Sequence, residues 1–269
     1  MNKILLVGCG HMGSALLKAW SLKTDCSFVV IDPAQHQYIN KNFNKKVKAF
    51  KTIEEIKNII LFDIIIFAIK PQIAEQVLKN FSKPKFKKQT VFVSIVAGKK
   101  INFYNNFLPK NNQFIRVMPN MPAMIKQGMS CLIASKNVSL KNKNKVDSLF
   151  SKIGKILWLK NELEINKVTA ISGSGPGYIF FFIDAFEKAA LQLGLGEKVT
   201  KQLVHQTLFG SIHLLFTEKE SADVLANNIA IKGGTTEAAL NQFKNNKILH
   251  RTFKKVVKVA YLRANQLGK

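Results

Sequence analysis

The spacing G-x-G-x-x-G occurs near the start of the chain, in the segment GCGHMG at residues 8–13. In this spacing Gly8 permits a tight turn, and Gly10 lets the backbone approach a pyrophosphate. Gly13 lets the following helix pack closely against the preceding strand. The segment follows an apolar run and opens a helix-like stretch, so helix N–H groups would face the bound anion. The sequence therefore predicts a dinucleotide-binding site.

Asp32 follows the second apolar run of the chain, where a dinucleotide fold places an acid about 20 residues beyond its glycines. A carboxylate there accepts a hydrogen bond from the 2′-OH of the adenosine ribose and repels a 2′-phosphate, which favours NADH over NADPH. Asp32 also precedes Pro33, and Asp before Pro is typical of a cap at a helix N-terminus. The sequence leaves both interpretations open.

Three further segments are candidates for contact with the cofactor. AIKPQ at residues 68–72 and SIVAG at 94–98 lie at expected carboxyl ends of strands, where open α/β sheets bind ligands. Lys70 is equally consistent with an ordinary surface lysine. RVMPNMP at 116–122 is too rich in proline for regular structure and is interpreted as a hinge or a cofactor-facing loop. The residues predicted to bind the cofactor are Gly8, Cys9, Gly10, His11, Met12, Gly13, Asp32, Ala68, Ile69, Lys70, Pro71 and Ala97.

The first part of the chain alternates strand-like and helix-like stretches. Continuous apolar runs at residues 63–69 and 90–96 are typical of buried parallel strands, and Pro71 suits the first turn of a helix between them. The other elements expected here are strands at 3–7 and 27–31 and helices at 12–20 and 71–81. We therefore predict an α/β fold whose N-terminal Rossmann domain, a doubly wound parallel sheet, spans residues 1–160.

The strand pattern stops after residue 160, so residues 161–269 are expected to form a C-terminal all-α domain. Residues 178–194 are apolar nearly all round, and a helix of this kind must be buried on several faces. Further helices are expected at 201–218 and 248–268. Because the domain is of modest size, we expect burial against a second subunit, which predicts a homodimer.

The 269 residues carry a formal net charge of +25, yet only three of the 41 basic residues are arginines. Arginine is the usual bidentate reader of guanine and phosphate. The lysines are scattered along the chain, so we interpret the charge as that of a generally lysine-rich surface. Nucleic-acid binding remains an alternative function. A basic field also attracts an anionic cofactor.

The cysteines and the apolar runs indicate the redox compartment of the protein and whether it binds metals or membranes. Cys9, Cys26 and Cys131 are odd in number and widely spaced, and no His/Cys group has metal-ligand spacing. This pattern predicts no metal site and fits a reducing cytoplasm. The longest apolar run, residues 59–69, contains Asp63 and is too short for a membrane helix, so no membrane partner is expected.

A set of segments in one order carries a family resemblance. AIKPQ, SIVAG, MPN, TAISGSGP from residue 169, and GGTT at 233–236 resemble the pyrroline-5-carboxylate reductase family over nearly the whole chain. The resemblance implies an N-terminal Rossmann domain, a helical C-terminal domain and intertwined dimers that can assemble further. It implies reduction of 1-pyrroline-5-carboxylate to L-proline with NADPH or NADH.

The glycine-rich segment at residues 169–177 is expected to bind substrate and not a second pyrophosphate, because no strand precedes it. Pro176 fits the first turn of the aromatic helix, whose N-terminal amides suit a carboxylate. In the family, this segment and the GGTT loop bound the substrate pocket. The resemblance assigns catalytic positions to Thr169, Ser172, Ser174 and Thr236, and substrate binding to Gly173, Gly175, Pro176, Gly233, Gly234 and Thr235. For each hydroxyl, helix capping is the alternative.

The chain departs from the family pattern at four positions. Gly177 replaces the usual Ala after the proline, and Asn166 replaces the usual Asp before the threonine. Ile231 and Lys232 replace the usual Ser-Pro before GGTT. Loss of the serine removes one contact to the substrate carboxylate, so substrate affinity and identity are less firmly implied.

Two rival functions remain beside the reductase. β-Hydroxyacid dehydrogenases place a catalytic Lys and Asn where this chain has Ile179 and Ile183, which cannot relay a proton. A dinucleotide-binding paralogue that has lost catalysis would share every cofactor motif. No catalytic triad or carboxylate pair is evident, and His205 and His213 are interpreted as core or surface residues. An imine reductase needs no such acid, because the product nitrogen can take its proton from water.

Overall fold

The computed structural model describes residues 2–23, 26–43 and 45–268. It divides into two compact units, the first formed by residues 1–176 with 260–269 and the second by residues 177–259. The helices α7 (Gly175–Leu191) and α11 (Ile248–Leu267) each pass from one unit to the other. The predicted functional division near residue 160 stays a prediction.

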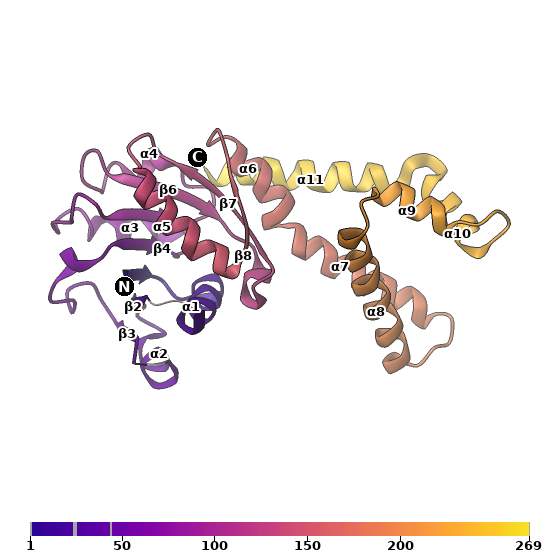
Figure 1. Ribbon diagram of the computed structural model, residues 1–269, viewed down its shortest axis with the longest axis horizontal. Helices are drawn as coiled ribbons and strands as arrows, with labels where there is room; N and C mark the ends of the chain where they lie inside the picture. Colours follow the sequence, from indigo (N-terminus) through magenta and orange to yellow (C-terminus); the bar gives the residue numbers. More distant parts are fainter. Residues whose placement is uncertain (1, 24–25, 44, 269) are drawn as a thin grey trace. The chain divides into compact units, whose positions relative to one another are not determined.

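The first unit is built on one sheet with the strand order β3-β2-β1-β4-β5-β6-β7-β8 (Figure 1). The chain leaves β1 in one direction for β2 and β3, then returns to place β4 on the other side of β1. Neighbours are parallel, except that β7 runs antiparallel to β6. The strands are β1 (Lys3–Val7), β2 (Ser27–Ile31), β3 (Val47–Phe50), β4 (Ile64–Phe67), β5 (Val91–Ser94), β6 (Gln113–Met118), β7 (Gly128–Ala134) and β8 (Gly154–Trp158). The carboxyl ends of β1 and β4 thus meet at the point where the winding direction reverses, the usual ligand position.

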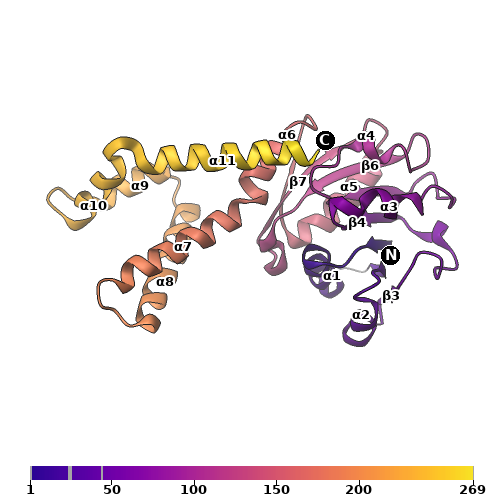
Figure 2. The same cartoon turned by 180° about the vertical axis from the view of Figure 1, so that it is seen from behind.

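Helices cover both faces of this sheet. On one face α1 (His11–Lys23), α2 (His36–Asn42) and α5 (Leu140–Phe150) pack on one apolar cluster. On the other face, α3 (Ala74–Lys79) and α4 (Ile101–Tyr104) pack on a second cluster (Figure 2). Because β4 and β5 are buried on both faces, their sequences are continuous apolar runs.

The second half of the chain is helical. After α6 (Glu164–Val168) and the π-helical turn η5 (Thr169–Gly173), α7 leads into α8 (Glu197–Thr217), α9 (Ala222–Ile229) and α10 (Thr235–Lys244). The short 3₁₀ turns are η1 (Ile59–Leu61), η2 (Pro71–Ile73), η3 (Met121–Ile125), η4 (Ser151–Ile153) and η6 (Asn245–Lys247). The last turns of α11 return to the first unit, where Asn166 Nδ2 donates a hydrogen bond of 2.8 Å to Asn265 Oδ1.

The second unit buries very little of its apolar surface within one chain. Among its described residues, only Thr200 and Val204 are buried. Phe181 on α7 and Phe216 on α8 are 76% and 78% exposed. His205 lies on the surface, where its Nε2 contacts Glu187 Oε1 at 2.5 Å, and His213 is also exposed.

The predicted α/β class is confirmed, and the four strands predicted from apolar runs are present. β3, β6, β7 and β8 were not predicted. The prediction of irregular structure at residues 116–122 was wrong, because Arg116 and Met118 lie in β6 and Met121 begins η3. Pro119 follows the strand because it cannot donate to a sheet ladder, and its neighbouring prolines obscured the strand in the sequence.

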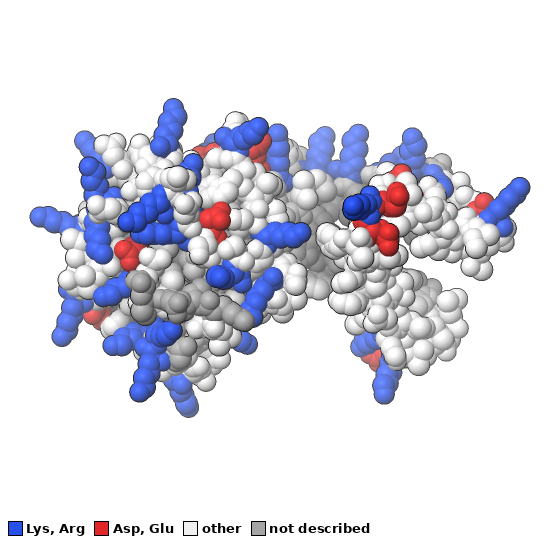
Figure 3. All heavy atoms as spheres, viewed as in Figure 1, with Lys and Arg blue, Asp and Glu red and all other residues white. Residues whose placement is uncertain are grey.

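The distribution of charge concerns binding to nucleic acid, and the length of the helices concerns insertion into a membrane. In the view of Figure 3, Lys and Arg side chains are spread over many elements of the first unit and do not gather in one patch. Of the helices in the described part of the chain, none is both long and apolar enough to cross a membrane.

Candidate active site

The glycine loop after β1 has the backbone geometry that its spacing predicts. Gly8 has φ +92°, and a Cβ there would lie 2.7 Å from the carbonyl oxygen of Ala68. A Cβ on Gly13 would lie 2.6 Å from the carbonyl oxygen of Gly8, because helix and loop are in close contact. Beside Gly10, by contrast, no atom lies within 4 Å of a Cβ position. The first and third glycines are therefore needed by the fold, whereas Gly10 faces open space that a ligand can fill.

The helix α1 supplies an anion site next to this open space. It begins at His11, and the Ser14 amide closes its first turn on the Gly10 carbonyl at 2.8 Å. The amides of His11, Met12 and Gly13 have no carbonyl four residues back within the helix. Such amides, at the positive end of the helix, bind the pyrophosphate of a dinucleotide. The residues present therefore fit this cofactor.

A cavity of about 440 Å³ adjoins the loop at the carboxyl ends of β1, β2 and β4. Its walls include Val7, Ile31 and Ile69, which end or follow these strands. Asp32 and Lys51 are among its polar lining residues. Its size lies within the usual range for small-molecule sites, and its apolar walls with a few polar groups suit an adenosine.

Both carboxylate oxygens of Asp32 accept hydrogen bonds from backbone amides. Oδ1 accepts from the amides of Ala34 and Gln35, each at 2.9 Å, and so caps the turn that leads into α2. The side chain of Asp32 therefore holds the turn before α2, whose N-cap is Gln35 without a side-chain cap bond. Oδ2 accepts from the Cys9 amide at 2.6 Å, a bond to the glycine loop that the sequence did not predict. Burial, and secondarily the Asp32 charge, raise the pKa of the Cys9 thiol to about 12.

The loops after β4 and β5 carry the other predicted cofactor residues. Ala68 is fixed to β1, since its amide donates to the Val7 carbonyl at 2.7 Å. Ile69, Pro71 and Ala97 are partly buried near the sheet edge, whereas Lys70 is exposed. The structure therefore brings all the predicted cofactor residues into one unit, at or near one edge of one sheet. Their contacts with a cofactor stay a prediction.

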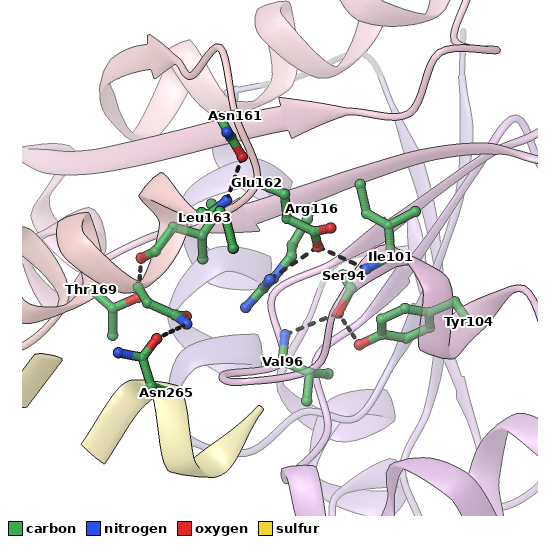
Figure 4. Close-up of polar contacts among 12 residues, drawn as sticks. Ser94, Val96, Ile101, Tyr104, Arg116, Asn161, Glu162, Leu163, Thr169 and Asn265 are labelled. Carbon is green, nitrogen blue, oxygen red and sulfur yellow. Dashed lines mark hydrogen bonds and ion pairs between the residues drawn. The ribbon is translucent and has the colours of Figure 1, made fainter. Parts of the chain in front are cut away.

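A tyrosine that sequence reasoning missed holds the loop after β5. The buried Ser94 accepts a hydrogen bond from the Val96 amide at 3.1 Å, and its Oγ lies 2.5 Å from the Tyr104 hydroxyl oxygen (Figure 4). Burial raises the pKa of Tyr104 to about 12. The hydroxyl therefore stays protonated at neutral pH and fixes the loop that leads to Ala97. Only the folded chain places Tyr104 against this loop.

An ion pair between a buried arginine and a partly exposed glutamate joins three segments of the site. Arg116 at β6 is 2% exposed, and its NH1 lies 3.1 Å from Glu162 Oε1 (Figure 4). The same oxygen accepts the Ile101 amide at the start of α4, at 2.7 Å. One carboxylate thus connects β6, the loop after β5 and the segment that enters α6. Neither residue was predicted to form an ion pair.

The segment from Thr169 to Pro176 lies inside a nearly continuous helical run. Pro176 is in the first turn of α7, as predicted. The amides there are not those of a free helix end, however, because η5 joins α7 to α6 and the Ser174 amide donates to the Thr169 carbonyl at 2.8 Å. Pro176 cannot donate to the Ser172 carbonyl four residues back, and Asn120 Nδ2 donates to it instead, at 3.0 Å. π-helical turns of this kind occur frequently at functional sites.

The hydroxyls of this segment differ in their availability. Thr169 Oγ1 donates to the Ile165 carbonyl at 2.6 Å, and Ser172 Oγ donates to the Val168 carbonyl at 3.0 Å. Both bonds run back along the helix and are not N-terminal caps. Within the described residues the Ser174 hydroxyl has no hydrogen-bond partner. A Cβ on Gly175 or on Gly177 would have no atom within 4 Å, so this side of the segment is open.

The GGTT residues form a true helix start in the second unit. Gly233 has φ +78°, and its amide donates to Glu237 Oε2 at 2.8 Å. Gly234 is the N-cap of α10, whose first two residues are Thr235 and Thr236. The predicted substrate residues thus lie in both units, and the pocket that they would share stays a prediction. Two of the four positions that depart from the family pattern have a clear environment in the structure. Ile231 is 75% exposed, and Asn166 forms a hydrogen bond with Asn265.

Comparisons with known proteins agree with this arrangement. Residues 162–267 match the family model described as pyrroline-5-carboxylate reductase dimerisation, and residues 3–98 match one described as NADP oxidoreductase, coenzyme F420-dependent. The pyrroline-5-carboxylate reductase of Pasteurella multocida is 32% identical over 100% of this chain and 98% of its own length. That of Haemophilus influenzae is 30% identical over 89% of this chain and 88% of its own. The solved pyrroline carboxylate reductase of Plasmodium falciparum, with NADP bound, has a TM-score of 0.87 at 28% identity and covers 100% of this chain and 98% of that one. This chain therefore belongs to the pyrroline-5-carboxylate reductase family.

Proposed function

We propose that this chain reduces 1-pyrroline-5-carboxylate to L-proline with a hydride from NADPH or NADH. The observation that carries the proposal is the glycine loop, open at Gly10 and adjoining a cavity of about 440 Å³ at the sheet edge. In a chain of this family, that geometry supports a redox cofactor at the first unit. The catalytic chemistry then belongs to the cofactor, and the protein supplies binding and orientation.

The cofactor half of the reaction uses groups of the first unit. The amides of α1 beyond Gly10 would bind the pyrophosphate, and the cavity beside Asp32 would hold the adenosine. The loop from Ser94 to Ala97 is held by Tyr104 and would contact the rest of the cofactor. When bound, NAD(P)H would supply the hydride for the carbon of the protonated imine. The electron pair of the C=N bond then stays on the nitrogen as the amine of L-proline, and the proton that this nitrogen carries comes from water.

The substrate half uses the segment from Thr169 to Pro176 and the GGTT residues. Ser174, with a free hydroxyl beside the open Gly175, is the first candidate to contact the substrate. The α10 amides behind Thr235 and Thr236 lie at the positive end of a helix and suit the substrate carboxylate. Contacts of this kind would orient the imine carbon for hydride transfer.

A lapsed, cofactor-binding paralogue is the second candidate, because Ile231 and Lys232 replace the usual Ser-Pro. Such a protein would bind the cofactor without turnover.

We also infer a cytoplasmic location, which the three unpaired cysteines support.

The test is a spectrophotometric assay with 1-pyrroline-5-carboxylate and each reduced cofactor. We expect loss of absorbance at 340 nm and formation of L-proline. If both cofactors bind but neither is oxidised at high protein concentration, the paralogue is supported and the reductase is excluded.

A further inference from the structure

Asp32 lies between the glycine loop and the adenosine cavity and contacts both. We propose that Asp32 is a positioning residue that fixes the phosphate-binding loop for either cofactor, and that it does not act by binding the ribose 2′-OH. The inference rests on the dinucleotide binding of the proposed function. It assigns to Asp32 a different role from that of a ribose-binding acid, which is one of the two interpretations that the sequence leaves open.

The first argument is the number of hydrogen bonds that the carboxylate already accepts. A carboxylate has about four lone-pair sites. Three of them are directed at the amides of Ala34, Gln35 and Cys9, at 2.9, 2.9 and 2.6 Å. Only one site, on Oδ2, is left for a ligand. Bonds from backbone amides to a carboxylate are charge-assisted and hold their partners firmly.

The second argument is what the Cys9 bond does for the loop. Cys9 stands between two glycines, and glycine loses more conformational freedom on ordering than any other residue. The loop is tied to the end of β2 at two points: the Gly8 amide donates to the Ile31 carbonyl at 2.8 Å, and the Cys9 amide donates to Asp32. These bonds fix the direction of the amides that follow at Gly10 and His11 before the cofactor binds. Fixing a loop in its bound conformation improves affinity, because its ordering is then no longer opposed to binding.

The two roles differ in which ligand groups they favour. A ribose-binding acid would favour ligands with a 2′-OH and repel a 2′-phosphate. A loop clamp would favour every ligand with a pyrophosphate, whatever stands at the 2′ position. An analogue of NADH with 2′-deoxyadenosine separates the two, since it has the same charge as NADH and lacks only the 2′-OH.

The experiment measures the dissociation constants of NADH, the 2′-deoxy analogue and NADPH, by fluorescence titration of the full-length protein. The proteins are wild type, Asp32→Asn and the matched control Glu75→Gln. The Asn variant keeps an oxygen for Ala34 and Gln35, but its NH₂ group faces the Cys9 amide. Glu75 on α3 is exposed and is not among the residues that line the cavity, so its variant makes the same change of charge outside the cofactor site.

We expect wild type to bind NADH and the 2′-deoxy analogue with equal affinity, within about threefold, because no strong bond to the 2′-OH is lost. Asp32→Asn should weaken all three ligands, NADPH included, by about tenfold, the effect of one lost charge-assisted bond. Its KM for cofactor should rise while kcat changes little. Glu75→Gln should stay within about twofold of wild type.

The inference is overturned if wild type binds the 2′-deoxy analogue more than about tenfold more weakly than NADH and Asp32→Asn removes that difference. It is also overturned if Asp32→Asn strengthens NADPH binding beyond the Glu75→Gln control. If the Asn variant does not fold, the wild-type comparison of NADH with its 2′-deoxy analogue decides alone. Failure of wild type to bind any of the three ligands would instead count against the proposed function.

Discussion

The two units of this chain solve the burial of apolar surface in different ways. The first closes its sheet between two apolar clusters, in which Trp20, Phe67 and many other large side chains are fully buried. The second leaves Phe181 and Phe216 more than three-quarters exposed. An exposed apolar surface of this extent marks an interaction site. The first unit can therefore form its core within one chain, whereas the second needs a partner surface.

The two units also differ in how the residues that we propose for function are positioned. In the first unit, the residues that we propose to bind the cofactor are positioned by bonds within the chain, such as those of Asp32, Tyr104 and Glu162. In the second unit, Gly233 and Thr235, which we propose to bind substrate, lie at an exposed helix start. We therefore expect cofactor binding to depend on local geometry and substrate binding to depend on the homo-oligomer.

The largest effect should follow from a charge in the apolar surface of the second unit. In a two-fold dimer each substitution acts twice, so Phe181→Glu should weaken association by at least roughly 100-fold, from about 1.5 kcal/mol lost per buried Phe. The matched control is Leu22→Glu on α1, since Leu22 is 70% exposed and Phe181 76%. Light scattering should give a monomer mass for the first variant and an oligomer for the second. An unchanged mass for Phe181→Glu would contradict the contrast.

The ion pair of the buried Arg116 in the first unit should matter more than an exposed pair of the second. Arg116→Met leaves the partly exposed Glu162 without its cation and should lower the free energy of unfolding by about 1.5–3 kcal/mol, the effect of one lost charge-assisted bond. Lys188 pairs with Asp184 at 2.7 Å, but their side chains are 70% and 52% exposed. Lys188→Met should therefore change stability by less than about 0.5 kcal/mol. Urea denaturation of both variants measures the difference, and equal losses would refute this account of Arg116.

Two substitutions in the glycine loop should have separate effects, one on stability and the other on cofactor binding. Gly13→Ala brings a Cβ to 2.6 Å from the Gly8 carbonyl oxygen, so we expect a loss of about 1–3 kcal/mol in stability. Gly10→Ala meets no atom within 4 Å and should leave the melting temperature unchanged while cofactor binding is lost. Thermal denaturation and cofactor titration are measured on both variants. Normal cofactor affinity in Gly10→Ala would show that the pyrophosphate does not approach this residue.

The smallest expected effect concerns alkaline pH. Because burial raises the pKa of Tyr104 from 10.0 to about 12, the folded state holds this proton more tightly than the unfolded state between those values. The free energy of unfolding therefore falls as pH rises from 10 towards 12, by up to about 1.4 kcal/mol per pH unit from this group. Tyr104→Phe should be less stable at neutral pH, since Ser94 loses a partner, and should have a shallower alkaline slope. Parallel slopes for the two proteins in urea titrations would contradict the assignment.

Local chemistry made part of this molecule predictable from its sequence. The roles of Gly8, Gly10 and Gly13 depend on their immediate neighbours, and the buried strands β4 and β5 are unbroken apolar runs. β6 was not recognised, because Pro119 follows directly and because its pairing with β5 and β7 is not written in its own residues. The bonds of Asp32 to Cys9 and of Arg116 to Glu162 join residues 23 and 46 positions apart, and only the fold brings them together. The helical run through Ser174 was likewise hidden by its glycines and Pro176.

The central claim is hydride transfer from the cofactor to 1-pyrroline-5-carboxylate, and it is tested most directly by isotope transfer. NADPH and NADH carrying deuterium at C4 of the nicotinamide are each incubated with the protein and the imine, and the product is examined by mass spectrometry. We predict L-proline with one deuterium at C5, formed in equal amount to the oxidised cofactor. Absence of labelled proline while the cofactor is bound would contradict the claim.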